Sequence, residues 1–212
     1  MRNPLKQLAL AAVGAGLLVA GTRPVAAANI SVNANITLSE TWTADNVYML
    51  ETVVYVTNGA TLTIEPGTVV RGLPDASTVG SNNPGTLVVT RGAKLRALGT
   101  KLNPVVFTDP FDDNVGNNPG NFPYDDRLNA AGLTGQWGGV ILLGKGYVAN
   151  NTLTGPNPAR TVQIEGLVAD GVNGIYGGCS SFPAQFPNAL DCDDDDSGTL
   201  TYASIRYGGF GL

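Results

Sequence analysis

The sequence has no histidine and only two cysteines among its 212 residues. The missing imidazole excludes histidine metal sites, Ser-His-Asp and Cys-His catalysis, and acid/base chemistry by histidine. Charged residues make up only 14% of the chain, and the formal net charge is −5. Because binding to phosphates needs clustered Lys and Arg, this acidic balance argues against nucleic acid as a partner.

A helical period is missing as well, since no stretch beyond residue 28 keeps apolar residues at a spacing of 3.6. The 28 glycines and 13 prolines resist helix interiors, while a hydrophobic content of 43% is enough to build a core. What remains is a series of short β-rich runs, each bounded by Gly, Pro, Asn or Asp. These runs predict an all-β protein, and they lie at residues 53–56, 61–64, 68–70, 86–90, 105–108, 140–143, 162–164 and 200–205.

Residues 1–28 have the pattern of an export signal. Arg2 and Lys6 give the positive start, Leu8–Ala20 is apolar, and small residues lead up to a cleavage site after Ala28. The alternative is a transmembrane anchor, but an apolar stretch of about 13 residues is short for a bilayer. We therefore expect an exported protein, at the cell surface, outside the cell or in the periplasm. Its mature chain would have no transmembrane span and a formal charge of −8, because the signal removes three basic residues and no acid.

Cys179 and Cys192 are the two cysteines. An even pair in an exported chain predicts a disulfide that closes a local loop. Two free thiols are the alternative.

An internal repeat narrows the fold. Val56–Leu62 matches Val89–Leu95 at an offset of 33 residues, and in both segments a strand enters a Gly-Ala corner before a second strand begins. The polar segment 73–85 between them has the composition of a loop that leaves the repeat. Short strands with corners, stacked so that each coil buries its inward side chains on the next, are typical of a parallel β-helix. A β-sandwich with irregular hairpins is the alternative.

Four segments in order resemble a set of bacterial exported right-handed parallel β-helix proteins. They are the "TLTIEPGTVV" coil within 60–70, the run 92–108, "GQWGGVILLG" at 135–144, and "DDSGTLTY" through "IRYGG" at 195–209. The resemblance implies an all-β, right-handed parallel β-helix and an envelope or extracellular location, without a defined activity.

On this basis we expect a lead-in segment over 29–49 and a β-helix over 50–212, with loop excursions at 73–85, 109–134 and 170–198. Proteins of this set usually continue for several coils beyond the Tyr-Gly-Gly motif, so the resemblance predicts a chain truncated at its C-terminus. The alternative is a short natural variant whose end is covered by a partner or by self-association.

The second acidic cluster predicts a calcium loop. Asp193, Asp195 and Ser197 place three oxygen ligands at alternate positions before Gly198, a spacing that suits Ca²⁺. A full EF-hand is excluded, because its twelfth position is Ser204 and no flanking helices are predicted. A solvated acidic turn is the alternative, and the first acidic cluster, from 109 to 126, has the same two interpretations.

An enzyme is the sharper hypothesis for the function, because many right-handed β-helices cleave acidic polysaccharides by paired carboxylates or by Ca²⁺-assisted elimination. Asp112/Asp113 and Asp125/Asp126 are the acid pairs, and Arg206 would be the basic group of a lyase or else a structural arginine. The β-helix hydrolases and lyases carry a histidine-bearing element, which this chain lacks. Catalysis is therefore not favoured.

The aromatic residues have two possible roles. Tyr147, Tyr176 and Tyr207 are candidates for stacking on sugar rings, and Trp137, beside two glycines, is expected to fill a corner of the core. We thus predict an exported structural or binding β-helix module whose partners are glycans, envelope proteins or copies of itself, with Ca²⁺ as its only candidate cofactor. The alternative is a polysaccharide-processing lyase or hydrolase, or a fragment of one.

Overall fold

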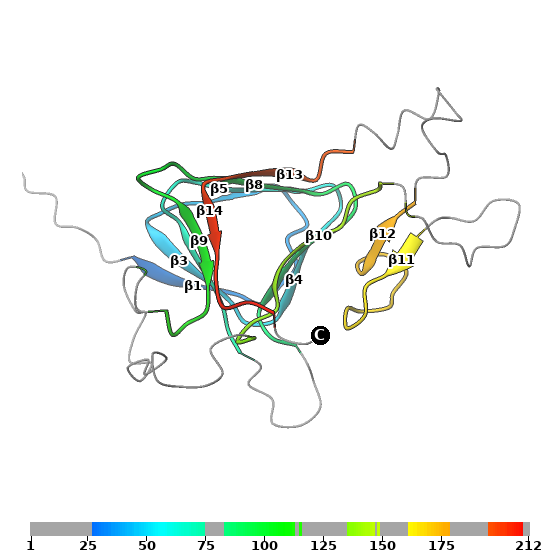
Figure 1. Ribbon diagram of the computed structural model, residues 1–212, viewed down its shortest axis with the longest axis horizontal. Coiled ribbons are helices and arrows are strands. Elements are labelled where there is room, and N and C mark those ends of the chain that lie inside the picture. Colours follow the sequence, from blue (N-terminus) through cyan, green and yellow to red (C-terminus); the bar gives the residue numbers. More distant parts are fainter. Residues whose placement is uncertain are drawn as a thin grey trace, which may run out of the picture.

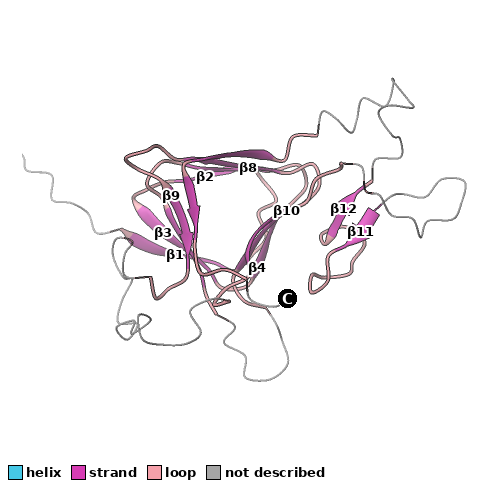
Figure 2. Ribbon diagram, viewed as in Figure 1, coloured by secondary structure: helices cyan, strands magenta, loops and turns pink. Residues whose placement is uncertain are grey.

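The computed structural model describes residues 27–74, 83–112, 115, 135–146, 148, 161–178 and 195–209. Every regular element in these ranges is a β-strand, as the sequence predicts (Figure 2). None of them contains a helix long and apolar enough to cross a membrane. Several sequence predictions fall outside the described residues. They are most of the signal peptide and the residues Asp113, Asp125, Asp126, Tyr147, Cys179, Cys192 and Asp193.

Three parallel sheets form the three sides of a solenoid that is triangular in cross-section (Figure 1). The first sheet has the order β1 (Ala28–Val32), β3 (Asn46–Leu50), β6 (Val69–Gly72), β9 (Val105–Thr108) and β14 (Ala203–Ile205). The second has the order β10 (Gly139–Leu142), β7 (Thr86–Val89) and β4 (Val53–Val56). The third has the order β13 (Gly198–Thr201), β8 (Lys94–Leu98), β5 (Thr61–Ile64) and β2 (Glu40–Trp42). The prediction of an all-β parallel β-helix is confirmed.

The register between coils explains the internal repeat of the sequence. Val56 pairs with Val89 and Leu62 pairs with Leu95, so the two matching segments lie directly above one another. The coil before them is shorter, because Glu40 pairs with Leu62, 22 positions later. The offset of 33 is thus one coil with an inserted loop, which leaves the solenoid after β6 and returns at β7.

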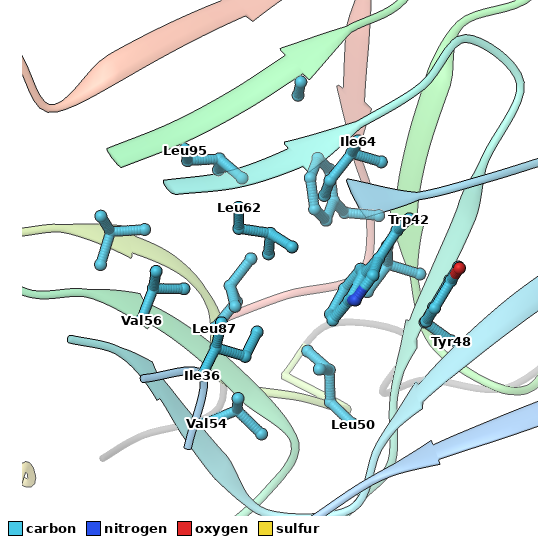
Figure 3. Close-up of a cluster of buried hydrophobic side chains, with 14 of the residues drawn as sticks. Ile36, Trp42, Tyr48, Leu50, Val54, Val56, Leu62, Ile64, Leu87 and Leu95 are labelled. Atoms are coloured by element: carbon cyan, nitrogen blue, oxygen red, sulfur yellow. The ribbon is translucent and has the colours of Figure 1, made fainter. Parts of the chain in front are cut away.

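The core fills the interior of the triangle with one side chain from every second position of each strand (Figure 3). Leu62, Leu95 and Phe107 have no exposed surface, and burial of each contributes roughly 1.5–3 kcal/mol relative to an exposed side chain. The stacking begins earlier than the expected lead-in segment 29–49 suggested, since β1, β2 and β3 already pair with coil strands. Tyr48 and Leu50 are inward residues of this first part of the solenoid.

A separate antiparallel hairpin lies outside the triangle. Its strands are β11 (Thr161–Gln163) and β12 (Ile175–Gly177), which pair only with each other (Figure 1). The sequence analysis placed the run at 162–164 in the coil and the excursion at 170–198. In the structure the excursion begins earlier, because the chain leaves the coil after β10 and returns at β13, so the run at 162–164 belongs to the excursion. A tight turn around Asp170, whose carboxylate accepts the N–H groups of Val172 and Asn173, makes local pairing available at little loop-closure cost.

Apolar contacts fix the hairpin to the outer face of the second sheet. Tyr55 and Val88 on the sheet form one cluster with Leu143 and Leu167 from the excursion. The Val168 N–H donates to the Tyr55 hydroxyl at 3.4 Å. Burial is the main reason that the pKa of Tyr55 is raised above its ordinary value. The second sheet is therefore covered on both faces, as parallel sheets usually are.

Candidate functional site

A groove of about 440 Å³ lies on the outer face of the first sheet. Val47, Val69 and Val106 line it from three adjacent strands, because their in-register pairing places all three on the same face. The polar side chains of its lining are Asn46, Asn103 and Arg206. The groove thus joins an apolar ladder to two amides and one guanidinium.

Arg206 lines this groove while it is bound to a buried acid. Asp112 is 2% exposed, and its Oδ2 accepts a hydrogen bond from Thr108 Oγ1 at 2.7 Å and from Arg206 Nη1 at 3.3 Å. The Arg206 Nε donates to Ser204 Oγ at 3.0 Å. These contacts tie the guanidinium to the loop after β9 and to β14, so they favour the structural interpretation of Arg206.

A second arginine, which the sequence analysis missed, fixes the start of the loop after β9. Arg71 is fully buried on β6, where its Nη1 donates to the Asp109 carbonyl at 2.8 Å. Its Nη2 donates to the carbonyls of Asp112 and Val115 at 3.2 and 2.9 Å. A signal was present in the sequence: an arginine inside an apolar strand, at the position that Met49 occupies in the coil before it.

Trp137 closes a corner of the core beside this loop and is fully buried, which confirms its expected packing role. Its Nε1 donates to the Arg206 carbonyl at 2.7 Å. The indole lies against Gly72, where an added Cβ would collide with the ring. Trp137 therefore holds the last coil at the same place where Asp112 binds Arg206.

The acidic turn before β13 brings together two of the three predicted calcium ligands. Ser197 Oγ lies 3.5 Å from Asp195 Oδ2, whereas Asp193 lies outside the described residues. Asp195 Oδ2 also accepts the Lys145 N–H at 2.7 Å, a donor that a cation at this oxygen would have to displace. Within the described ranges no three acidic, histidine or cysteine side chains form a metal cluster. The calcium site stays a prediction.

The neighbouring Asp196 has a different role. Its Oδ2 forms an ion pair with Lys94 Nζ at 2.7 Å, and its Oδ1 accepts the Gly198 N–H at 2.8 Å. The hydrogen bond from Lys94 is the main reason that the pKa of Asp196 lies below its ordinary value. This acid therefore fixes the return of the chain into β13.

The remaining candidates for sugar stacking belong to different parts of the fold. Tyr176 lies on β12 and packs partly buried against the cluster around Tyr55. Tyr207 follows β14, is also partly buried, and has a φ of 54°. Neither tyrosine lines the groove on the first sheet.

Residues 34–122 match a family model described as a pectate-lyase-like β-helix domain. The match runs from before β2 to beyond β9, so it includes most of the coils and the start of the loop that Arg71 anchors. It supports the likeness to β-helix families and is compatible with a binding protein or with an enzyme. Searches of curated proteins and of solved structures gave no significant match.

Proposed function

We propose that the chain is an exported β-helix module that binds an extracellular partner along the groove of the first sheet and does not transform it. The observation that carries this proposal is the engagement of the acids that the structure describes at the candidate sites; of the predicted acid pairs only Asp112 lies within the described residues, and Asp113, Asp125 and Asp126 do not. Asp112 is buried against Arg206, Asp195 accepts a backbone N–H, and Asp196 is paired with Lys94. A carboxylate used in this way is not available as an acid, base or nucleophile without breaking a contact of the fold.

Among the expected partners, the lining of the groove suits a glycan best. Amide side chains such as those of Asn46 and Asn103 can donate to and accept from sugar hydroxyls. Arg206, with 37% of its side chain exposed, can pair with a carboxylate of an acidic sugar beside its contact with Asp112. The valine ladder offers an apolar floor for the carbon atoms of a sugar ring.

The test is a binding panel of uronic-acid polymers and neutral polysaccharides with the mature chain. Asn103→Ala removes a groove amide from an exposed position, and Asn33→Ala removes an exposed amide from the first coil. We expect Asn103→Ala to weaken binding about tenfold, on the order of one hydrogen bond to a charged or polar sugar group, and Asn33→Ala to leave it unchanged. Equal losses in both variants would place the ligand elsewhere and contradict the proposal.

A second candidate function is polysaccharide cleavage, with which the match to the pectate-lyase-like domain is also compatible. The same panel separates it from binding when the products are followed. New reducing ends with unsaturated sugars would identify a lyase, and new reducing ends without them a hydrolase. Either activity in the mature chain would reverse our ranking.

Export is part of the proposal and has its own test. We expect secretion to remove residues 1–28, so that the mature chain begins at Asn29. This leaves Asn29–Val32 of β1 to pair with β3. Intact mass measurement of the exported protein gives the new N-terminus, and a protein that keeps its first residues in the membrane would support the anchor instead.

A further inference from the structure

The outer faces of the three sheets differ in their side chains and in what covers them. On the second sheet the outward Tyr55 and Val88 are large and mainly apolar, and the excursion that carries the hairpin packs over them. On the third sheet Thr41, Thr63 and Arg96 form an outward row across β2, β5 and β8, and both Thr41 and Arg96 are exposed. In this solenoid an apolar outer face is thus covered, whereas an exposed one is polar.

The first sheet has an apolar outer face that the chain covers only in part. Val47, Val69 and Val106 form an outward row across β3, β6 and β9. Ala27 and Val115 pack at this face, and the groove of about 440 Å³ is the space that they leave over the valines. The valines are 3% to 9% exposed because they form the floor of the groove. By comparison with the second sheet, we expect this row to carry a further apolar cover, which the described residues supply only in part.

The charge of the lining gives a second property of the occupant. Arg206 is the only charged residue among the described residues that line the groove, although the chain has 17 acidic residues. It follows Ser204 by two positions, and Ser204 continues the valine row beyond Val106. Asn46 lies on β3, at the opposite end of the row. The groove thus joins an apolar middle to polar ends, which suits a neutral or anionic ligand that carries apolar groups.

The side of the groove is formed by a leucine in a fixed turn. Leu102 lines the groove and is 87% exposed. The Thr100 N–H donates to the Asn103 carbonyl, and the Asn103 N–H donates to Thr100 Oγ1, both at 3.0 Å. These bonds close the turn around Leu102 and hold its side chain where an apolar group of a ligand can pack on it.

An unsubstituted sugar fits this groove incompletely. The described part of the lining contains no aromatic side chain on which a sugar ring could stack. Hydroxyls placed over the valines would lose water without gaining a hydrogen bond, which is unfavourable. Esterification of such a hydroxyl with a short acyl group removes its O–H donor and adds a methyl group, whose burial is favourable.

We propose that the glycan bound by the groove is O-acylated. Its acyl groups lie on the valine row beside Leu102, and its polar or anionic groups lie at Asn103 and Arg206. This proposal rests on the proposed function, since it names the class of glycan that the same groove takes. It makes Leu102 a residue that determines specificity through contact with the acyl group.

The test offers each polysaccharide of the binding panel in a deacetylated form and in a form O-acetylated to a low degree, with the same backbone and the same carboxylates. The mature chain should bind the acetylated form about fourfold more tightly for each acetyl methyl group that the groove buries, which corresponds to roughly 0.8 kcal/mol. Leu102→Ser should reduce this preference and leave the affinity for the deacetylated form unchanged. Leu38→Ser is the matched control, at a leucine that is 79% exposed and does not line the groove, and should keep the preference.

The outcomes separate this proposal from the proposed function. Equal binding of both forms, with a loss in Asn103→Ala, would overturn the acyl proposal and leave glycan binding in the groove standing. A preference for the acetylated form that is unchanged in Leu102→Ser would place the acyl groups elsewhere and would also overturn it. Binding of neither form would contradict both proposals.

Discussion

Replacement of Arg71 by methionine tests whether the buried guanidinium organises the loop beside the groove. Methionine is the matched substitution, because Met49 occupies the same register position one coil earlier. The change keeps an unbranched side chain of similar length on β6. It removes the three donors that bind the carbonyls of Asp109, Asp112 and Val115.

The magnitude follows from those three bonds. Each hydrogen bond to a charged group contributes roughly 1.5–3 kcal/mol, which sets a ceiling of several kcal/mol for the set. Part of the stability lost with these hydrogen bonds is regained, because a buried methionine does not carry the desolvation cost of a buried charge. We expect a net loss of about 3 kcal/mol in the free energy of unfolding, which for a chain of this size lowers Tm by roughly 6–12 °C. Arg71→Lys keeps the charge but only one directed contact, and should lose about half as much.

The assay combines thermal unfolding with hydrogen exchange, and Arg96→Met is its control. Arg96 is exposed on β8, so its replacement should change the free energy of unfolding by less than about 0.5 kcal/mol. In Arg71→Met the amides of Asp109, Phe111 and Asp112 should exchange faster, while those of the third sheet keep their protection. A Tm equal to that of Arg96→Met, with unchanged exchange at Asp109, Phe111 and Asp112, would refute the role of Arg71 as the anchor of this loop.

Three further predictions concern the return of the third excursion. Millimolar Ca²⁺ should raise the Tm of the wild-type chain and should not raise that of Asp195→Asn. A wild-type Tm that does not change when Ca²⁺ is added would exclude the calcium loop. Cys179→Ser should cost about 3 kcal/mol if Cys179 and Cys192 close a loop of roughly 14 residues, and mass measurement before and after reduction shows whether the bond exists. Because Lys94 holds the pKa of Asp196 below its ordinary 3.8, this pair stabilises the fold above that value, and the stabilisation is lost as the pH falls through the lower folded pKa. Lys94→Met should flatten that acid limb in a Tm series from about pH 5 to pH 2, and an unchanged limb would contradict the assignment.

The stacking of the coils could be predicted from the sequence because it repeats residue types at fixed positions. Val56 and Leu62 recur as Val89 and Leu95, and an inward position of one coil must be filled by an apolar side chain like the one below it. The loop at 73–85 could be predicted from the same repeat, because this polar stretch lies between the two matching segments and lengthens the offset between them. Trp137 was also correctly expected in a corner, because adjacent glycines leave room for its indole.

The hairpin and the two arginine contacts could not be predicted in this way. The run at 162–164 has the alternation of a coil strand, and only its partner shows that it pairs antiparallel with β12. Arg71 reaches carbonyls 38 to 44 positions away, and Arg206 reaches an acid 94 positions away. Contacts over such separations leave no periodic trace in one sequence. This explains why Asp112 was assigned to a possible acid pair although it serves the fold.

The solenoid accepts long excursions because their ends are joined by contacts of the coil itself. The first excursion is closed by the Gly85 N–H, which donates to the Leu73 carbonyl at 2.7 Å, and the last by the bond from the Lys145 N–H to Asp195. With its ends held together, an inserted loop does not alter the register of the strands on either side, so its length can vary at little cost. Loops of this kind are also where binding residues usually lie. Val115, whose carbonyl Arg71 binds, lines the groove, and for this reason we expect the sequence around Val115 to decide which glycan the groove accepts.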